Sequence, residues 1–334
     1  QYKMEKRKIE IMDTTLRDGE QTSGVSFSAS EKLTIAQLLL EELNIDRIEI
    51  ASARVSEGEF QGVKGIMAWA EEKGCTTRIE VLTFVDGGLS IEWMKKTGAK
   101  VQNLLTKGSL NHLTHQLKKT PEQHFNEIAQ AIALAQENNI ETNVYLEDWS
   151  NGMRNSPEYV FQYLDFFFFY PIKRVLLPDT LGGLVPSATF EFISKITTKY
   201  PDTHFDFHAH NDYDLSIANG MEAVKAGIQG LHVTVNGMGE RAGNAPLEST
   251  VAVINDFLPE IEIGVKESSL YSVSKLVETF TGYRIPANKP IVGDNVFTQT
   301  AGIHADGDNK NNLYFNNLLP ERFGRKRQYA LGKT

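Results

Sequence analysis

The sequence predicts an α/β fold, a (β/α)₈ TIM barrel, from two observations. Short apolar runs rich in β-branched residues alternate with amphipathic helical stretches, which is typical of parallel strands joined by helices. Eight strand-like runs follow one another before residue 240, and eight is the number that closes a barrel. An open doubly wound sheet is the alternative, but no G-x-G-x-x-G phosphate loop follows an early strand.

Each expected strand is a short apolar run, and most are followed by a stretch with helical periodicity. In the first helical stretch, Ser30 stands at the N-cap position before an apolar stripe from Leu33 to Leu39. The expected strands are Ile9–Met12, Arg47–Ile50, Arg78–Leu82, Val101–Leu105, Thr142–Leu146, Arg174–Leu177, His204–His208 and Leu231–Val235. The expected helices between them include Ser30–Leu43, Gly62–Glu72, Pro121–Glu137, Ser187–Lys199 and Leu215–Ala226.

The pattern changes after about Phe257. A helix at Ser268–Thr281 precedes a tail rich in Gly, Asn and Pro that still carries several aromatic anchors. We therefore expect a catalytic barrel over residues 1–265 and a small, α-rich linker subdomain over residues 266–334 that packs near it. The aromatic run Phe166–Tyr170 is apolar around a whole helical turn and is interpreted as core plus a subunit contact.

Composition narrows the class of protein. The chain has 334 residues, 41% hydrophobic and 23% charged, with a net charge of −9, which argues against a general nucleic-acid or anionic-membrane surface. The single cysteine, Cys75, excludes internal disulfides and a Cys-rich metal site and is interpreted as a small, buried or half-buried turn residue rather than a nucleophile. No apolar stretch is long enough to span a bilayer and no signal-peptide pattern opens the sequence, so we expect a cytoplasmic protein.

The most informative motif is Phe207-His208-Ala209-His210-Asn211-Asp212. Side chains of a strand alternate faces, so His208 and His210 point the same way and can share one divalent cation. A lone His-x-His is more often two ordinary polar residues at a strand end. Here, however, ionisable groups also follow four other strands, and in a barrel such positions meet at one end. Buried charges there require partners or a cation.

Two of those other strand ends offer further ligands. Asp18 after the first strand and the amide oxygen of Asn244 after the eighth would complete a mixed oxygen and nitrogen site with open positions, which suits Zn²⁺ or Mn²⁺. Arg17 would hold oxyanion charge with its guanidinium, although a local salt bridge to Asp18 is the simpler interpretation. The glycines at 237, 239 and 243 form either a phosphate cradle or, as we favour, a tight turn that presents Asn244, with Glu240 and Arg241 as a supporting ion pair.

Three motifs resemble the signatures of one family, the 2-isopropylmalate synthase-like metal-dependent acyltransferases. They are Thr15-Leu16-Arg17-Asp18-Gly19-Glu20-Gln21, His208-Ala209-His210-Asn211-Asp212 and Asn236-Gly237-Met238-Gly239-Glu240-Arg241-Ala242-Gly243-Asn244, and the resemblance runs from about Ile9 to the C-terminus. Two further segments, Tyr145–Gly152 and Arg322–Lys326, look more like the (R)-citramalate synthase branch.

The resemblance implies a site and its cofactors. It implies a divalent metal (Zn first, with Mn, Mg or Co as alternatives) on Asp18, His208, His210 and Asn244, with acetyl-CoA as co-substrate. It also implies a homodimer whose tail reaches the partner barrel, and a C-terminal regulatory domain that this sequence does not include. It places Arg17, Glu147 and His304 in catalysis, Arg17, Gln21, Leu82, Leu105, Tyr145 and Thr180 at the 2-oxo acid, and Asp306, Asn312, Leu313 and Tyr314 at acetyl-CoA.

The expected reaction is a Claisen-type condensation of acetyl-CoA with pyruvate, followed by thioester hydrolysis to (R)-citramalate and CoA. Bulky Leu82, Leu105 and Tyr145 would crowd a larger acid, but 2-isopropylmalate synthase acting on 2-oxoisovalerate is the alternative. An amidohydrolase-like barrel would carry its His-x-His on the first strand rather than the seventh. A hydroxymethylglutaryl-CoA lyase would use a loop cysteine, and Cys75 lies far upstream of such a loop. A non-catalytic metal-binding barrel is the remaining alternative.

Overall fold

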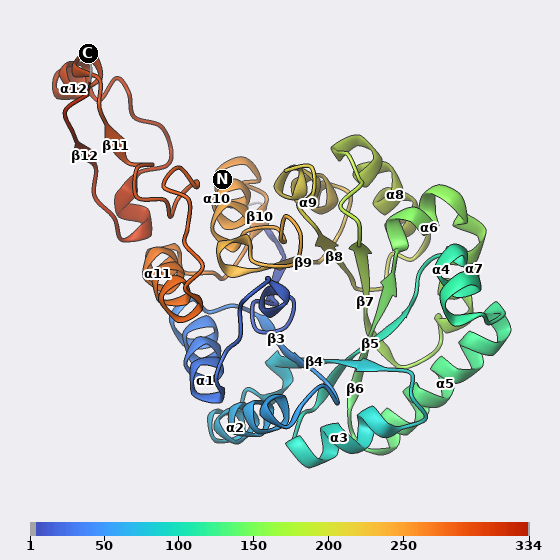
Figure 1. Ribbon diagram of the computed structural model, residues 1–334. Coiled ribbons are helices and arrows are strands. Elements are labelled where there is room, and N and C mark those ends of the chain that lie inside the picture. The colour runs from blue at the N-terminus through green and yellow to red at the C-terminus, as the bar shows by residue number, and fades with distance from the viewer. Residues whose placement is uncertain (1–4, 333–334) are drawn as a thin grey trace.

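The structure is a computed structural model, and it describes residues 5–332. Eight parallel strands close into a barrel in the order β2-β3-β4-β5-β6-β7-β8-β9, with β2 pairing β9, so the predicted barrel is confirmed and the open sheet was wrong (Figure 1). The barrel strands are β2 (Glu10–Asp13), β3 (Arg47–Ser52), β4 (Ile79–Phe84), β5 (Val101–Lys107), β6 (Glu141–Glu147), β7 (Ile172–Asp179), β8 (Phe205–Ala209) and β9 (Gly230–Val233).

Helices surround the barrel on its outer face (Figure 1). One continuous apolar core lies between strands and helices, and it includes Ile48 and Ile50 from β3 and Ile128 and Ile132 from α5. The helices are α1 (Ala29–Gln37), α2 (Glu57–Lys73), α3 (Leu89–Thr97), α4 (Leu110–His112), α5 (Pro121–Glu137), α6 (Trp149–Asn155), α7 (Pro157–Phe167), α8 (Pro186–Lys199), α9 (Ser216–Lys225) and α10 (Leu247–Phe257). Of the helices that the structure describes, none has both the length and the apolar character needed to cross a membrane.

Local chemistry explains where helices begin and end, and it corrects two expectations. The cap of α1 is Ser28 rather than Ser30, because the Ser28 hydroxyl accepts from the Glu31 N–H while the Glu31 carboxylate accepts from the Ser28 N–H. Helix α7 ends at Phe167, so only Phe166 and Phe167 of the aromatic run are helical. Phe167 is buried, whereas Phe169 lies in the following turn and is 91% exposed.

The inside of the barrel has two layers. In the lower layer, Arg47 reaches across from β3 to Glu80 on β4 (2.6 Å) and to Asp206 on β8 (2.7 Å), and all three side chains are buried. The upper layer is a small apolar cluster of Leu82, Tyr145 and Leu176, with Phe84 and Leu105 against it. A charged floor therefore supports an apolar wall below the carboxyl ends of the strands.

Beyond the barrel, the chain continues as a C-terminal arm. The arm begins with α11 (Leu270–Thr281), which packs on the barrel, and then projects away from it (Figure 1). Its outer part holds α12 (Gly302–Asn311) and the parallel pair β11 (Thr298–Gln299) and β12 (Gln328–Tyr329). Arg322 ties the arm to the barrel through Asp256 (2.9 Å) and Glu267 (2.7 Å). The other small sheet, β1 (Arg7–Lys8) with β10 (Ile261–Glu262), joins the beginning of the described chain to the segment after α10.

Candidate active site at the barrel mouth

A cavity of about 390 Å³ opens at the carboxyl ends of the strands. Active sites of such barrels are built at this end, because the loops that follow the strands converge there. The cavity collects most of the side chains that the sequence singled out, contributed by the ends of six strands. These are Arg17, Asp18, Gln21, Leu82, Leu105, Tyr145, Glu147, Thr180, His208 and His210.

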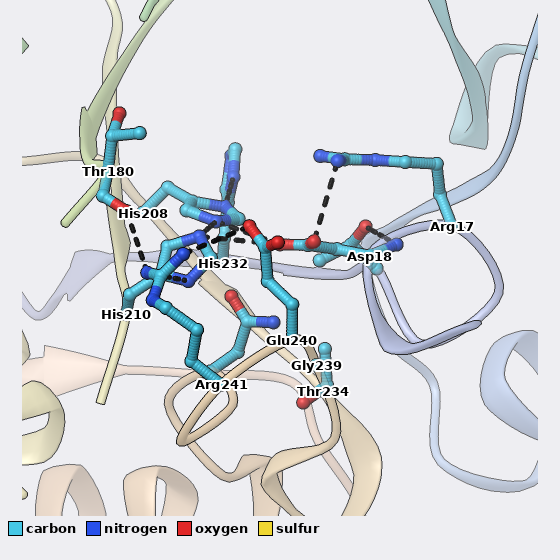
Figure 2. A network of polar contacts seen from close by, with 12 residues as sticks. Arg17, Asp18, Thr180, His208, His210, His232, Thr234, Gly239, Glu240 and Arg241 are labelled. Atoms are coloured by element: carbon cyan, nitrogen blue, oxygen red, sulfur yellow. Dashed lines mark hydrogen bonds and ion pairs between the residues drawn. The ribbon is translucent and has the colours of Figure 1, made fainter. Parts of the chain in front are cut away.

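Three of them form a buried cluster with the geometry of a cation site. One ligand atom from each of Asp18, His208 and His210 lies within 4.8 Å of the others. The His208 Nε2 atom is 3.1 Å from Asp18 Oδ2 and 3.2 Å from His210 Nε2. Figure 2 shows these side chains close together at the site. Two imidazoles and one carboxylate that converge in this way are a typical ligand set for Zn²⁺ and related cations.

Asn244 lies beside this cluster. It forms an isolated antiparallel bridge with His210, and its Nδ2 atom donates to the Met238 carbonyl at 3.0 Å. Its Oδ1 atom is buried and has no hydrogen-bond partner among the described residues. A buried amide oxygen without a donor is costly, so this atom fits a bound cation. Gly237, Gly239 and Gly243 all have positive φ angles in the loop that leads to Asn244. At Gly239 (φ +156°) an added Cβ would lie only 2.4 Å from Asn244 Nδ2.

The electrostatics suit a cation as well. Burial lowers the pKa of both imidazoles, that of His210 to about 4, so both rings are neutral at pH 7 and offer a lone pair. Burial alone would raise the pKa of the Asp18 carboxyl, but the Arg17 guanidinium and His208 hold it well below its usual range. The cluster thus carries one negative charge and would leave a bound divalent cation net positive.

Arg17 is held by a residue that the sequence did not single out. Its Nε atom donates to Glu49 Oε1 at 2.6 Å, whereas its nearest contact to Asp18 is 3.6 Å, so the simple local salt bridge is not its main interaction. Glu49 also accepts from Thr14 Oγ1 (2.8 Å) and from Asn103 Nδ2 (2.7 Å). In the sequence, Glu49 is a charged residue inside an apolar strand, and this pattern indicates a buried and paired side chain.

Two other predicted residues lie at neighbouring strand ends. Glu147, at the end of β6, forms an ion pair with Lys107 and remains partly exposed to the cavity. The Thr180 hydroxyl accepts from the Asp148 N–H at 2.9 Å, which fixes the loop after β7. Arg241 makes the expected pair with Glu240 (3.1 Å), but it pairs more closely with Asp212 (2.8 Å), and this second contact was missed.

The predicted residues of the tail lie apart from this cavity. His304, on α12, faces the ring of Tyr314 at a centroid distance of 4.2 Å and contacts Gln299 (3.2 Å). Asp306 pairs with Lys310 on the same helix, and Leu313 is exposed. Asn312 ends the helix in the left-handed conformation (φ 51°). The structure brings these residues together with one another, but not to the barrel mouth of their own chain (Figure 1).

Comparison with known proteins agrees with the barrel. The model of the HMGL-like family matches residues 8–277, which is most of the chain. The chain belongs to the HMGL-like family. This assignment confirms the predicted resemblance at the level of the superfamily, because relatives with both expected names are found.

Curated relatives of this HMGL-like chain carry two different names. It is 35% identical over 327 residues to a putative (R)-citramalate synthase of Methanopyrus kandleri, covering 97% of this chain and 62% of the relative. It is 36% identical to a probable 2-isopropylmalate synthase of Ignicoccus hospitalis, covering 98% of this chain and 79% of that one. An (R)-citramalate synthase of Methanocaldococcus jannaschii is also 36% identical, and 64% of its length is covered. The chain thus spans under two thirds of these citramalate synthases.

Solved structures support the fold of this HMGL-like barrel. The HMG-CoA lyase of Bacillus subtilis superposes with a TM-score of 0.72 over 84% of this chain and 96% of the lyase, at 23% identity. The carboxyl transferase domain of Rhizobium etli pyruvate carboxylase superposes with a TM-score of 0.63 over 83% of this chain and 47% of the solved chain, at 14% identity. At these identities the likeness concerns the barrel alone.

Proposed function

We propose that this chain is the catalytic part of a metal-dependent acyltransferase that condenses acetyl-CoA with pyruvate. Acetyl-CoA, pyruvate and water would give (R)-citramalate and free CoA. The observation that carries the proposal is the Asp18, His208 and His210 cluster, which lies beside Arg17 in a cavity with an apolar wall. Relatives named citramalate synthase and isopropylmalate synthase support the reaction type equally, so the 2-oxo acid has to be argued from the cavity.

The cation would be held by Asp18, His208, His210 and Asn244, and when bound it would supply Lewis-acid polarisation of the keto acid. Zn²⁺ is the first choice for this ligand set, with Mn²⁺, Mg²⁺ and Co²⁺ as alternatives. The chain's own contribution is binding and orientation. Arg17, fixed by Glu49, presents its remaining N–H groups beside the cluster, where they would hold the carboxylate or the developing alkoxide of the acid.

The apolar wall supports the choice of the smaller acid. Leu82, Leu105 and Tyr145, with Phe84 beside them, line the cavity above the charged floor. A methyl group would fit against this wall with less crowding than the isopropyl group of 2-oxoisovalerate. Each additional methylene alters discrimination by about 1–3 kcal/mol, so the chain would prefer pyruvate but not exclude larger acids. Gln21 and Thr180 lie at the rim and would contact the polar end of the acid.

Acid–base chemistry would involve Glu147 from the barrel and His304 from the tail. Because His304 lies outside the cavity of its own chain, we propose that a second copy of the chain supplies it, in a homodimer, together with Asp306, Asn312, Leu313 and Tyr314 at acetyl-CoA. Glu147 and His304 would take the methyl proton of acetyl-CoA and return a proton to the product. Water then cleaves the thioester.

The decisive experiment is a thiol-release assay with acetyl-CoA, Zn²⁺ or Mn²⁺, and a series of 2-oxo acids. The expected result is CoA release with pyruvate at a higher kcat/KM than with 2-oxoisovalerate. A preference for 2-oxoisovalerate would favour the isopropylmalate synthase alternative, and no release with any acid would refute the acyltransferase.

Mixing two inactive variants tests the shared site. His208→Ala and His304→Ala should each be inactive alone. If His304 acts on the partner's barrel, a mixed dimer has one site with both residues intact, and activity should return on mixing after subunit exchange. His304→Ala should also retain the metal content of the wild type. Activity of the His304→Ala variant alone would remove this residue from the mechanism.

A further inference from the structure

Directly beneath the candidate cation site lies a third histidine that neither the motifs nor the proposed mechanism use. His232, on β9, is buried, and its ring meets that of His208 edge to face at a centroid distance of 5.2 Å (Figure 2). The Nδ1 atoms of the two rings are 3.0 Å apart. On its other side, His232 Nε2 is 2.9 Å from Asp206 Oδ2. Asp206, His232 and His208 therefore form one continuous chain of contacts that ends at the cluster.

The contact between Asp206 and His232 determines which nitrogen of His232 carries a proton. Asp206 is buried and paired with the guanidinium of Arg47 at 2.7 Å, so it is a carboxylate and can only accept hydrogen bonds. The proton between Asp206 and His232 therefore belongs to His232 Nε2. In a neutral imidazole, the other nitrogen is then an acceptor. A neutral His232 would thus present a lone pair at Nδ1 toward His208.

The contact between His232 and His208 determines which nitrogen of His208 faces the cluster with a lone pair. Two facing nitrogens 3.0 Å apart need one proton between them, and with His232 Nδ1 as the acceptor that proton would sit on His208 Nδ1. With a cation bound, the lone pair of His208 would then be on Nε2, the atom that lies 3.1 Å from Asp18 and 3.2 Å from His210. The Tyr145 hydroxyl, 3.3 Å from His232 Nδ1, approaches the same acceptor from the side of the cavity.

The backbone beside Asp206 leaves room for this chain of contacts. Gly230 stands beside Asp206 in the register of β8 and β9, and a Cβ added there would lie 1.9 Å from Asp206 Oδ1. A side chain at this position would push the carboxylate away from His232.

We propose that Asp206 and His232 are positioning residues that fix His208 with its Nδ1–H turned inward and its Nε2 lone pair turned to the cation. Outer contacts of this kind orient metal-binding histidines and typically change metal affinity 10–100-fold when removed. The inference rests on the cation site of the proposed function, but it concerns metal binding rather than turnover.

The test measures Zn²⁺ affinity by competition with a chromophoric chelator. His232→Leu should weaken Zn²⁺ binding 10–100-fold, and His232→Asn, whose amide oxygen can stand near the lost Nδ1 acceptor, should recover part of that loss. The matched control is His124→Leu, a buried histidine that instead accepts from the Lys107 N–H and lies outside the cavity, and its Zn²⁺ affinity should match the wild type.

A second measurement needs no variant. In the Zn²⁺-loaded wild type labelled with ¹⁵N-histidine, the proton shared by the two Nδ1 atoms should be bonded to His208, with His232 Nδ1 unprotonated. A proton on His232 Nδ1, or a His232→Leu variant that binds Zn²⁺ within threefold of the wild type, would overturn the inference alone. A wild type that binds no Zn²⁺ would instead refute the cation site on which both proposals rest.

Discussion

Replacing Glu49 with Gln removes one charge from beneath Arg17 while keeping the size of the side chain. Glu49 is fully buried and accepts three hydrogen bonds, from Arg17 Nε, Thr14 Oγ1 and Asn103 Nδ2. A glutamine can offer its oxygen to Arg17 and Thr14, but its NH₂ group then faces the NH₂ group of Asn103. Asn103 cannot turn to relieve this, because its own oxygen already accepts from Asn143 Nδ2 at 2.9 Å.

The magnitude follows from that geometry. Breaking a buried ion pair by removing one partner costs about 3–5 kcal/mol, and here the remaining charge on Arg17 keeps only Asp18, at 3.6 Å. We therefore expect Glu49→Gln to lower the free energy of unfolding by about 3 kcal/mol or more. Since Arg17 would also lose its orientation, kcat/KM should fall by about 100-fold, as when one donor of an oxyanion site is lost.

Chemical denaturation and the thiol-release assay together check this prediction. The matched control is Glu59→Gln, which breaks the ion pair of Lys32 with Glu59 outside the cation cluster and should lower stability but leave kcat/KM close to the wild type. If Glu49→Gln were as active as the wild type, Glu49 would not orient Arg17. If it were as stable, the buried network would not carry the energy assigned to it.

Three other changes test the cavity and the fold. Gly239→Ala should weaken Zn²⁺ binding at least tenfold by displacing Asn244, although it removes no ligand, and unchanged affinity in a chelator competition would contradict this. Leu105→Ala should raise the ratio of kcat/KM for 2-oxoisovalerate over pyruvate by about tenfold, which a steady-state comparison measures. Burial raises the pKa of Asp13 from 3.8 to about 7. The folded state therefore binds a proton that the unfolded state has lost, and the contribution of Asp13 to stability falls by about 4 kcal/mol as pH rises from about 4 to about 7. Asp13→Asn should remove that part of the pH dependence in urea titrations, and an unchanged slope would refute it.

The sequence was sufficient for the barrel because each strand carries its own apolar pattern, and the strand ends converge only in a closed sheet. The ends of the strands were less certain, since β5 and β6 continue into the polar residues Lys107 and Glu147, which side-chain pattern alone assigns to loops. His208 and His210 could be predicted as a pair because they are neighbours on one strand face.

The supporting residues could not be found in the same way. Glu49, Asp206 and His232 lie on three different strands, and their meaning depends on which side chains the closed barrel brings opposite them. A charged residue in an apolar strand indicates a buried partner, but not its identity. The position of His304 was likewise beyond the sequence, since the direction of the C-terminal arm depends on how α11 packs and on the ion pairs of Arg322.

The charged layer of Arg47, Glu80 and Asp206 has a consequence for the unfolding of the barrel. Arg47 and Glu80 belong to the first four strands of the barrel, whereas Asp206 belongs to the last four. The cation cluster is divided in the same way, with Asp18 in one half and both imidazoles in the other. A half-barrel cut between β5 and β6 would separate Asp206 from the guanidinium and leave it with His204 and His232 as its partners. We therefore expect each half to be less stable alone than in the closed barrel.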